Sequence, residues 1–130
     1  MKVYKRIMVT AFCLSGVVAC GSSADSASAY IDSGKELLAD GKPEKARVEF
    51  KNAIQIDPQV SESYYQLALL DEKAKRWKSM FANLSRVETL DAKHYDAVIK
   101  LGQLFLLSGN FDEALTRANR VITEDANNPK

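Results

Sequence analysis

Apolar residues recur along most of the chain at the spacing of amphipathic helices. Two consecutive stretches each place such residues on one helix face: Tyr30, Gly34, Leu37 and Leu38 in the first, and Ala46, Phe50, Ala53 and Ile54 in the second. Gly41 and Pro43 stand between the stretches, and Asp57-Pro58 follows the second. Glycine ends a helix readily and proline suits the first turn of the next one. The pattern therefore predicts two helices joined by a tight turn.

The same pattern returns twice more at an offset of 34 residues, in segments that begin at Ala27, Ser61 and Tyr95. Equivalent positions carry equivalent residue types: Gly34, Ala68 and Gly102; Ala46, Met80 and Ala114; Phe50, Leu84 and Ala118; Ala53, Val87 and Val121. Small residues at all of the first set, and at Ala46 and Ala114 of the second, allow paired helices to approach closely. A single helical hairpin cannot bury its own apolar face, so the hairpins must stack.

This spacing resembles the tetratricopeptide repeat (TPR), and "AYIDSGKELLADGKPEKARVEFKNAIQIDP" carries the resemblance most fully. The resemblance covers residues 27 to about 128 and implies an all-α helical-hairpin solenoid of six helices in three repeats: 27–60, 61–94 and 95–128. We expect residues 129–130 to begin a further repeat of a longer array, because no polar capping helix follows the third. The second repeat departs from the pattern: Asp71 stands where a bulky residue is usual, Met80 replaces alanine, and "DEKAKRWK" has no glycine. We expect packing there to adjust around Trp77 and Met80.

The N-terminal segment has the order of a secretory signal peptide. A basic "MKVYKR" precedes 13 uncharged residues, 7–19, which are too few for the roughly 20 of a membrane span. "VVAC" then resembles a bacterial lipobox, although ordinary signal cleavage at the same bond is the alternative. The resemblance implies a signal peptide over 1–19, a covalent lipid on Cys20 and a flexible tether over 20–26 that reaches roughly 25 Å at most. It also implies a bacterial envelope protein, anchored in the outer membrane and facing the periplasm, because Gly21 rather than Asp follows the cysteine.

Composition and charge exclude several functions. Three of the 18 basic residues lie in the first twenty, and without them 15 basic residues face 17 acidic ones, which disfavours nucleic-acid binding. Cys13 would be lost with the signal and Cys20 would be alkylated, so neither a disulfide nor a thiolate metal site is expected. His94 is the single histidine and we expect it to be a solvated loop residue. No catalytic set or metal-ligand spacing is present in the sequence, so we expect no enzyme activity, no metal and no cofactor besides the lipid.

The TPR resemblance implies that the first helix of each hairpin lines a concave groove for an extended peptide or a partner helix. Its groove positions carry over to Ile31, Lys35 and Leu38 in the first repeat, to Glu62, Tyr65, Gln66 and Leu69 in the second, and to Asp96, Ile99, Lys100 and Gln103 in the third. Leu38, Leu69 and Ile99 could instead pack between hairpins, whereas core packing does not require Tyr65 or Lys100. The carboxylate clamp of chaperone-binding TPR domains is absent, since Ile31, Lys35 and Asp96 occupy clamp positions.

These expectations leave three functions open. The first is a lipid-anchored scaffold for protein interactions in envelope assembly, because "EKARVEFKNAIQIDPQ" and the short tether are similar to TPR lipoproteins of exosortase and exopolysaccharide export systems. The second is a pilus-assembly lipoprotein that helps a secretin form its ring. The third is an interaction arm for a C-terminal enzymatic or carbohydrate-binding domain.

Overall fold

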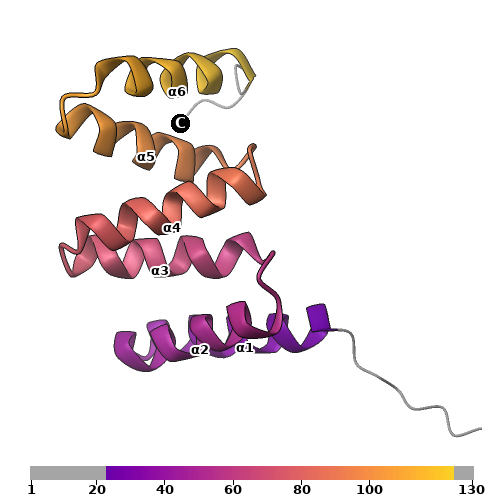
Figure 1. The fold of residues 1–130 in the computed structure, drawn as a ribbon. Helices are drawn as coiled ribbons and strands as arrows, with labels where there is room; N and C mark the ends of the chain where they lie inside the picture. The colour runs from indigo at the N-terminus through magenta and orange to yellow at the C-terminus, as the bar shows by residue number, and fades with distance from the viewer. Residues whose placement is uncertain (1–22, 125–130) are drawn as a thin grey trace, which may run out of the picture.

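The computed structural model describes residues 23–124, which form six α-helices (Figure 1). The helices are α1 (Ser23–Ala39), α2 (Pro43–Ile56), α3 (Ser61–Lys73), α4 (Trp77–Leu90), α5 (Tyr95–Leu107) and α6 (Phe111–Glu124). The expected signal segment and Cys20 lie outside the described residues. The helices α2, α4 and α6 begin 34 residues apart, as the sequence period predicts.

The helices pair in chain order into three hairpins, α1–α2, α3–α4 and α5–α6, which stack one on the next (Figure 1). Consecutive hairpins meet where α2 contacts α3 and where α4 contacts α5. We call the first of these contact regions seam 1 and the second seam 2. This architecture confirms the predicted all-α helical-hairpin solenoid of six helices.

The first helix begins earlier than expected. α1 starts at Ser23, so residues 23–26, which we expected to belong to a flexible tether, are helical. Ala27, four residues into this helix, is buried against the first core cluster. Burial of Ala27 fixes the first turns of α1 on α2, and the helix therefore extends back past the repeat boundary.

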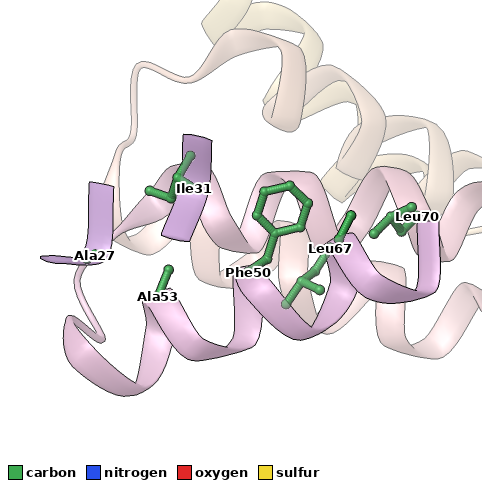
Figure 2. Close-up of a cluster of buried hydrophobic side chains, with 7 residues drawn as sticks. Ala27, Ile31, Phe50, Ala53, Leu67 and Leu70 are labelled. Carbon is green, nitrogen blue, oxygen red and sulfur yellow. The ribbon is translucent and has the colours of Figure 1, made fainter. Parts of the chain in front are cut away.

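Close packing of the first hairpin depends on the pairing of Gly34 with Phe50. The Phe50 side chain is fully buried, and it lies in a cluster with Ala27, Ile31, Ala53, Leu67 and Leu70 (Figure 2). A Cβ atom placed on Gly34 would lie 2.5 Å from Phe50 Cε1. That distance is a steric clash, so the aromatic ring needs a residue without a side chain opposite it. Gly34 and Phe50, which are 16 residues apart in the chain, thus form a close contact between α1 and α2.

In the second hairpin, different residues pack between the two helices. Ala68 takes the place of Gly34, and Met80, Leu84 and Val87 are buried beside it, as expected for Met80. Trp77 does not join them, which corrects the expectation that it packs in the core: it is 51% exposed. Trp77 is the first residue of α4, equivalent to Pro43 and Phe111, and all three first residues are exposed. The packing of this hairpin therefore adjusts through Met80, which is buried with Leu84 and Val87, and not through Trp77.

The turn of the second hairpin keeps its conformation without glycine. Gly41 and Gly109 have φ of 71° and 80°, and Lys75 at the equivalent position has φ of 56°. In each turn the next backbone N–H donates back to the carbonyl five residues earlier, as Arg76 N does to Asp71 O at 2.8 Å. This helix-ending motif satisfies carbonyls that the helix leaves unpaired. Its geometry therefore persists even though a residue with a side chain is strained in the left-handed region.

Alanine substitution at two glycines tests the packing of the hairpins. Gly34→Ala should lower the free energy of unfolding by about 1–3 kcal/mol, because the added methyl group overlaps the Phe50 ring. Gly102→Ala is the matched control, since its added Cβ would lie 3.6 Å from Arg117 Cβ and has room. Alanine also raises helix propensity by up to about 1 kcal/mol, so Gly102→Ala should be neutral or stabilising. Urea denaturation of both variants measures the difference, and equal losses would show that the Gly34 contact is misplaced.

Candidate functional site

The predicted groove residues lie on α1, α3 and α5, and their charges pair between neighbouring hairpins. Lys35 Nζ on α1 lies 2.9 Å from Glu62 Oε1 on α3. Lys100 Nζ on α5 lies 2.8 Å from an oxygen of Glu72 on α3. We call the surface formed by these three helices the groove face. These pairs connect neighbouring hairpins, and because the charges compensate one another the net charge of the face stays small.

The surroundings of Glu62 and Tyr65 on the groove face shift the pKa of each side chain. Burial alone would raise the pKa of Glu62, but hydrogen bonds from Lys35 and from Gln66 Nε2, at 3.0 Å, outweigh burial and lower that pKa below its usual value. The pKa of Tyr65 is raised, first by burial and then by the nearby carboxylates of Asp96, Glu62 and Glu72. Glu62 therefore stays ionised and Tyr65 stays neutral at ordinary pH.

Tyr65 contacts the single histidine. The Tyr65 and His94 ring centroids are 4.3 Å apart, and the rings are tilted by 48°. His94 is the N-cap of α5, where its Nδ1 accepts a hydrogen bond from Ala97 N at 3.3 Å. This corrects the expectation of a solvated loop histidine: the side chain is half-buried. His94 has a structural role that joins the second hairpin to the third.

The structure corrects the prediction that Ile31 lines the groove. Ile31 is only 8% exposed and belongs to the core cluster that Phe50 organises (Figure 2). Its equivalents 34 and 68 residues later, Tyr65 and Ile99, are half-buried and 41% exposed. At Ile31 this position is covered by residues of α2 and α3, which belong to the same core cluster. Ile31 therefore contributes packing and is not available to a ligand.

The remaining predicted residues divide between two surfaces. Lys35, Glu62, Tyr65, Gln66 and Lys100 are brought together by the pairs described above. Ile99 and Gln103 instead line a depression between α5 and α6, in the last of the described hairpins. Leu38 packs against the first core cluster, and Leu69 is half-buried. Asp96 is exposed beside Tyr65, whose pKa it helps to raise.

A buried carboxylate holds seam 1, and the sequence did not reveal its role. Asp71 on α3 is 1% exposed. Its Oδ1 accepts hydrogen bonds from Arg47 Nη1 on α2 at 2.8 Å and from Arg76 Nε at 3.0 Å, and its Oδ2 accepts from Asn83 Nδ2 on α4 at 2.9 Å. A buried charge is tolerated when it is paired and hydrogen-bonded. The departure from the repeat pattern at Asp71 was the available signal.

At seam 2, the residues equivalent to Arg47, Asp71 and Asn83 make aromatic and cation–π contacts. Phe81 and Phe105, equivalent to Arg47 and Asp71, meet edge to face with centroids 5.2 Å apart. Arg117, equivalent to Asn83, lies over the Phe105 ring at 4.4 Å. Arg117 is also paired with Glu88 at 2.9 Å and with Glu113. Burial would lower the pKa of Arg117, but these carboxylates raise it above its usual value. The two seams thus have the same geometry and different chemistry.

The described residues hold no arrangement suited to metal or membrane-spanning roles. Across residues 23–124 there is no group of three or more potential metal ligands among His, Cys, Asp and Glu. Within the same range, no helix is long and apolar enough to cross a bilayer.

Sequence comparison finds related segments in longer proteins. No protein-family model matches the chain. The chain is 32% identical over 88 residues to BBSome complex member BBS4 of Bos taurus, which covers 68% of this chain and 17% of that protein. It is 32% identical over 103 residues to DnaJ homolog subfamily C member 3 of Mus musculus, with 79% of this chain and 20% of that protein covered. The chain thus spans about a fifth of the length of these relatives.

Solved structures define the class of the fold. The chain is similar to the crystal structure of MamA, with a TM-score of 0.64 and 24% identity over 75% of this chain and 57% of that one. It is also similar to the second TPR of Spaghetti (RPAP3) bound to the HSP90 peptide SRMEEVD, with a TM-score of 0.66 and 20% identity over 75% and 90% of the two chains. A third neighbour is the N-terminal domain of stress-induced protein-1 from C. elegans, with a TM-score of 0.66 and 20% identity over 79% and 87%. The protein is a helical-hairpin solenoid of the TPR fold.

The Glu62 contacts predict a specific pH dependence of stability. The pKa of Glu62 is lowered on folding, so its contribution is present above the unfolded value of about 4.5 and is lost as pH falls through the folded value. At pH 7, Glu62→Gln should be less stable than wild type by no more than about 1 kcal/mol, because the pair is partly exposed. The gap should close as pH falls from about 4.5 through the lower folded value.

Urea midpoints of wild type and Glu62→Gln between pH 7 and pH 3 measure this gap. Glu36→Gln, at an exposed acid on α1, is the matched control and should follow the wild-type curve. A gap between Glu62→Gln and wild type that is unchanged at pH 3 would contradict the assigned contacts.

Proposed function

We propose that this protein is a membrane-anchored, non-catalytic scaffold that binds a protein or peptide partner along the groove face. The observation that carries the proposal is the pairing of Lys35 with Glu62 and of Lys100 with Glu72 across successive hairpins. These pairs hold three helices in one arrangement before any partner arrives, and such preorganisation reduces the entropic cost of binding. The peptide bound to the RPAP3 TPR domain supports a peptide as the partner class.

The residues of the groove face limit the chemical kinds of partner segment that suit it. Ile31, at a position where chaperone-binding domains carry a basic residue, is buried, and Asp96 places a carboxylate at another clamp position. Asp96 would repel the C-terminal carboxylate of an acidic chaperone tail. Because the lysines of the face are already paired with glutamates, we infer a partner segment of mixed polar and apolar residues.

The anchor is the second part of the proposal, with a lipid on Cys20. α1 begins at Ser23, only three residues after Cys20. Three residues reach at most about 11 Å, which is less than the roughly 25 Å expected for a tether over 20–26. The repeats would then lie against the bilayer surface, and a partner would be captured next to the membrane. The pathway we propose is envelope assembly, with export of exopolysaccharide or protein as the process served.

Two experiments test the two parts. A photo-crosslinking amino acid at Gln66, on α3 within the groove face, should trap a partner in intact cells, and the same probe at Gln55, exposed on α2, should not. Labelled palmitate should enter the wild-type chain, whereas Cys20→Ser should carry no label. Equal crosslinking at Gln66 and Gln55 would contradict the groove face as the binding surface. Equal labelling of Cys20→Ser would contradict the anchor.

A further inference from the structure

A polar hollow of about 430 Å³ lies at seam 1, and residues of α2, α3 and α4 line it. Three of its lining side chains are cationic: Arg47 and Lys51 on α2, and Arg76 at the N-cap of α4. The two acids that line it are Glu44 and Asp71. Because both the first and the second hairpin contribute walls, the hollow exists only while the two hairpins are stacked.

The acids of the hollow leave one positive charge uncompensated. Asp71 is 1% exposed, and its two oxygens accept hydrogen bonds from three side chains, those of Arg47, Arg76 and Asn83. One carboxylate neutralises only one of the two guanidinium groups that it contacts. The Glu44 side chain is 77% exposed, and its oxygen lies 3.7 Å from Arg47 Nε, which is longer than a hydrogen bond. The hollow therefore holds three cations against two acids.

Donors that line the hollow also lack acceptors. Arg47 donates to Asp71 through Nη1, whereas its Nε and Nη2 are buried without a hydrogen-bond partner. Lys51 is exposed, and no described acid pairs with it. Buried polar groups in native proteins are nearly always hydrogen-bonded, and an exception points to a bound water or ion. The unmet donors and the uncompensated charge thus indicate the same kind of ligand, an anion.

We propose that the hollow at seam 1 binds a small oxyanion, a carboxylate or phosphate group, between Lys51 of the first hairpin and Arg76 of the second. Both side chains are exposed and make the direct contacts, and the exposed Ser79 hydroxyl on α4 donates a further hydrogen bond. Arg47 is largely buried and contributes mainly its charge. Ammonium and guanidinium groups form charge-assisted hydrogen bonds with carboxylates and phosphates, which are roughly twice as strong as neutral ones.

Other small ligands fit the lining less well. Its apolar part is limited to Leu67 and Ala82, so it offers little to an apolar molecule. The excess of positive charge disfavours a metal cation. Water would satisfy donors but would leave the charge uncompensated, whereas an oxyanion does both.

Occupancy of the hollow would stabilise the stack. A ligand that binds the folded chain and not the unfolded chain raises stability by mass action. An anion between Lys51 and Arg76 would join the same two hairpins that the Lys35–Glu62 pair joins on the groove face. The site depends neither on the groove partner nor on the lipid anchor, so it can be tested separately from both.

Thermal unfolding of the full chain in rising inorganic phosphate tests the proposal. Circular dichroism at pH 7 gives the midpoint, and sodium chloride keeps the ionic strength constant. The midpoint should rise by roughly 4 °C or more when phosphate is about fivefold above its dissociation constant. Acetate in the same scheme tests the carboxylate form of the ligand.

Lys51→Gln and Lys45→Gln are the matched variants. Both lysines are exposed on α2, but only Lys51 lines the hollow. Lys51→Gln should raise the apparent dissociation constant for phosphate at least fivefold, and Lys45→Gln should keep the wild-type response. A general effect of salt on the protein surface would raise all three midpoints alike. Equal rises in wild type and Lys51→Gln, or no rise with either phosphate or acetate, would overturn the proposal.

Discussion

The contact at the eleventh position of each following hairpin, Asp71 at seam 1 and Phe105 at seam 2, is the interaction on which the stack depends. Each of these side chains is held by the second helix of the preceding hairpin and by the second helix of its own hairpin. At seam 1 the partners are Arg47 and Asn83, and at seam 2 they are Phe81 and Arg117. A hairpin of this type has no core of its own to complete. Its stability therefore depends on whether the side chain across the seam matches.

This dependence makes the order of the hairpins specific. Asp71 opposite Phe81 would be a buried carboxylate that lacks its Arg47 partner, and Phe105 opposite Arg47 would leave its guanidinium with only the exposed Glu44, at 3.7 Å. Leaving a buried charge without its partner is strongly destabilising. The groove face follows from the same constraint, because the seams align α1, α3 and α5 so that Lys35 meets Glu62 and Lys100 meets Glu72. The groove face and the stacking order are thus set by one set of contacts.

The features that could be predicted from the sequence are those that repeat locally. The 34-residue period predicted the hairpins and their turns, and the small residue at Gly34 predicted a close helix contact. The roles of Asp71 and Ile31 could not be predicted, because they depend on residues 24 to 36 positions away that meet only once the seam has formed. The repeat pattern marked Asp71 as a departure, but Arg47 becomes its partner only in the stacked structure. Trp77 and His94 were misjudged for a related reason: residue type suggested packing for one and solvent for the other, whereas position at a helix start decided both.

The most direct test of this account is a double-mutant cycle that transplants seam 2 into seam 1. Asp71→Phe alone should lower the free energy of unfolding by about 3–5 kcal/mol, because Arg47 loses its buried partner. Arg47→Phe alone should cost less, because Arg76 and Asn83 still donate to Asp71. The double variant recreates the Phe81–Phe105 pair and should be more stable than the sum of the two losses implies by at least about 2 kcal/mol in urea denaturation. Losses that simply add would contradict the claim that the match across the seam holds the stack together.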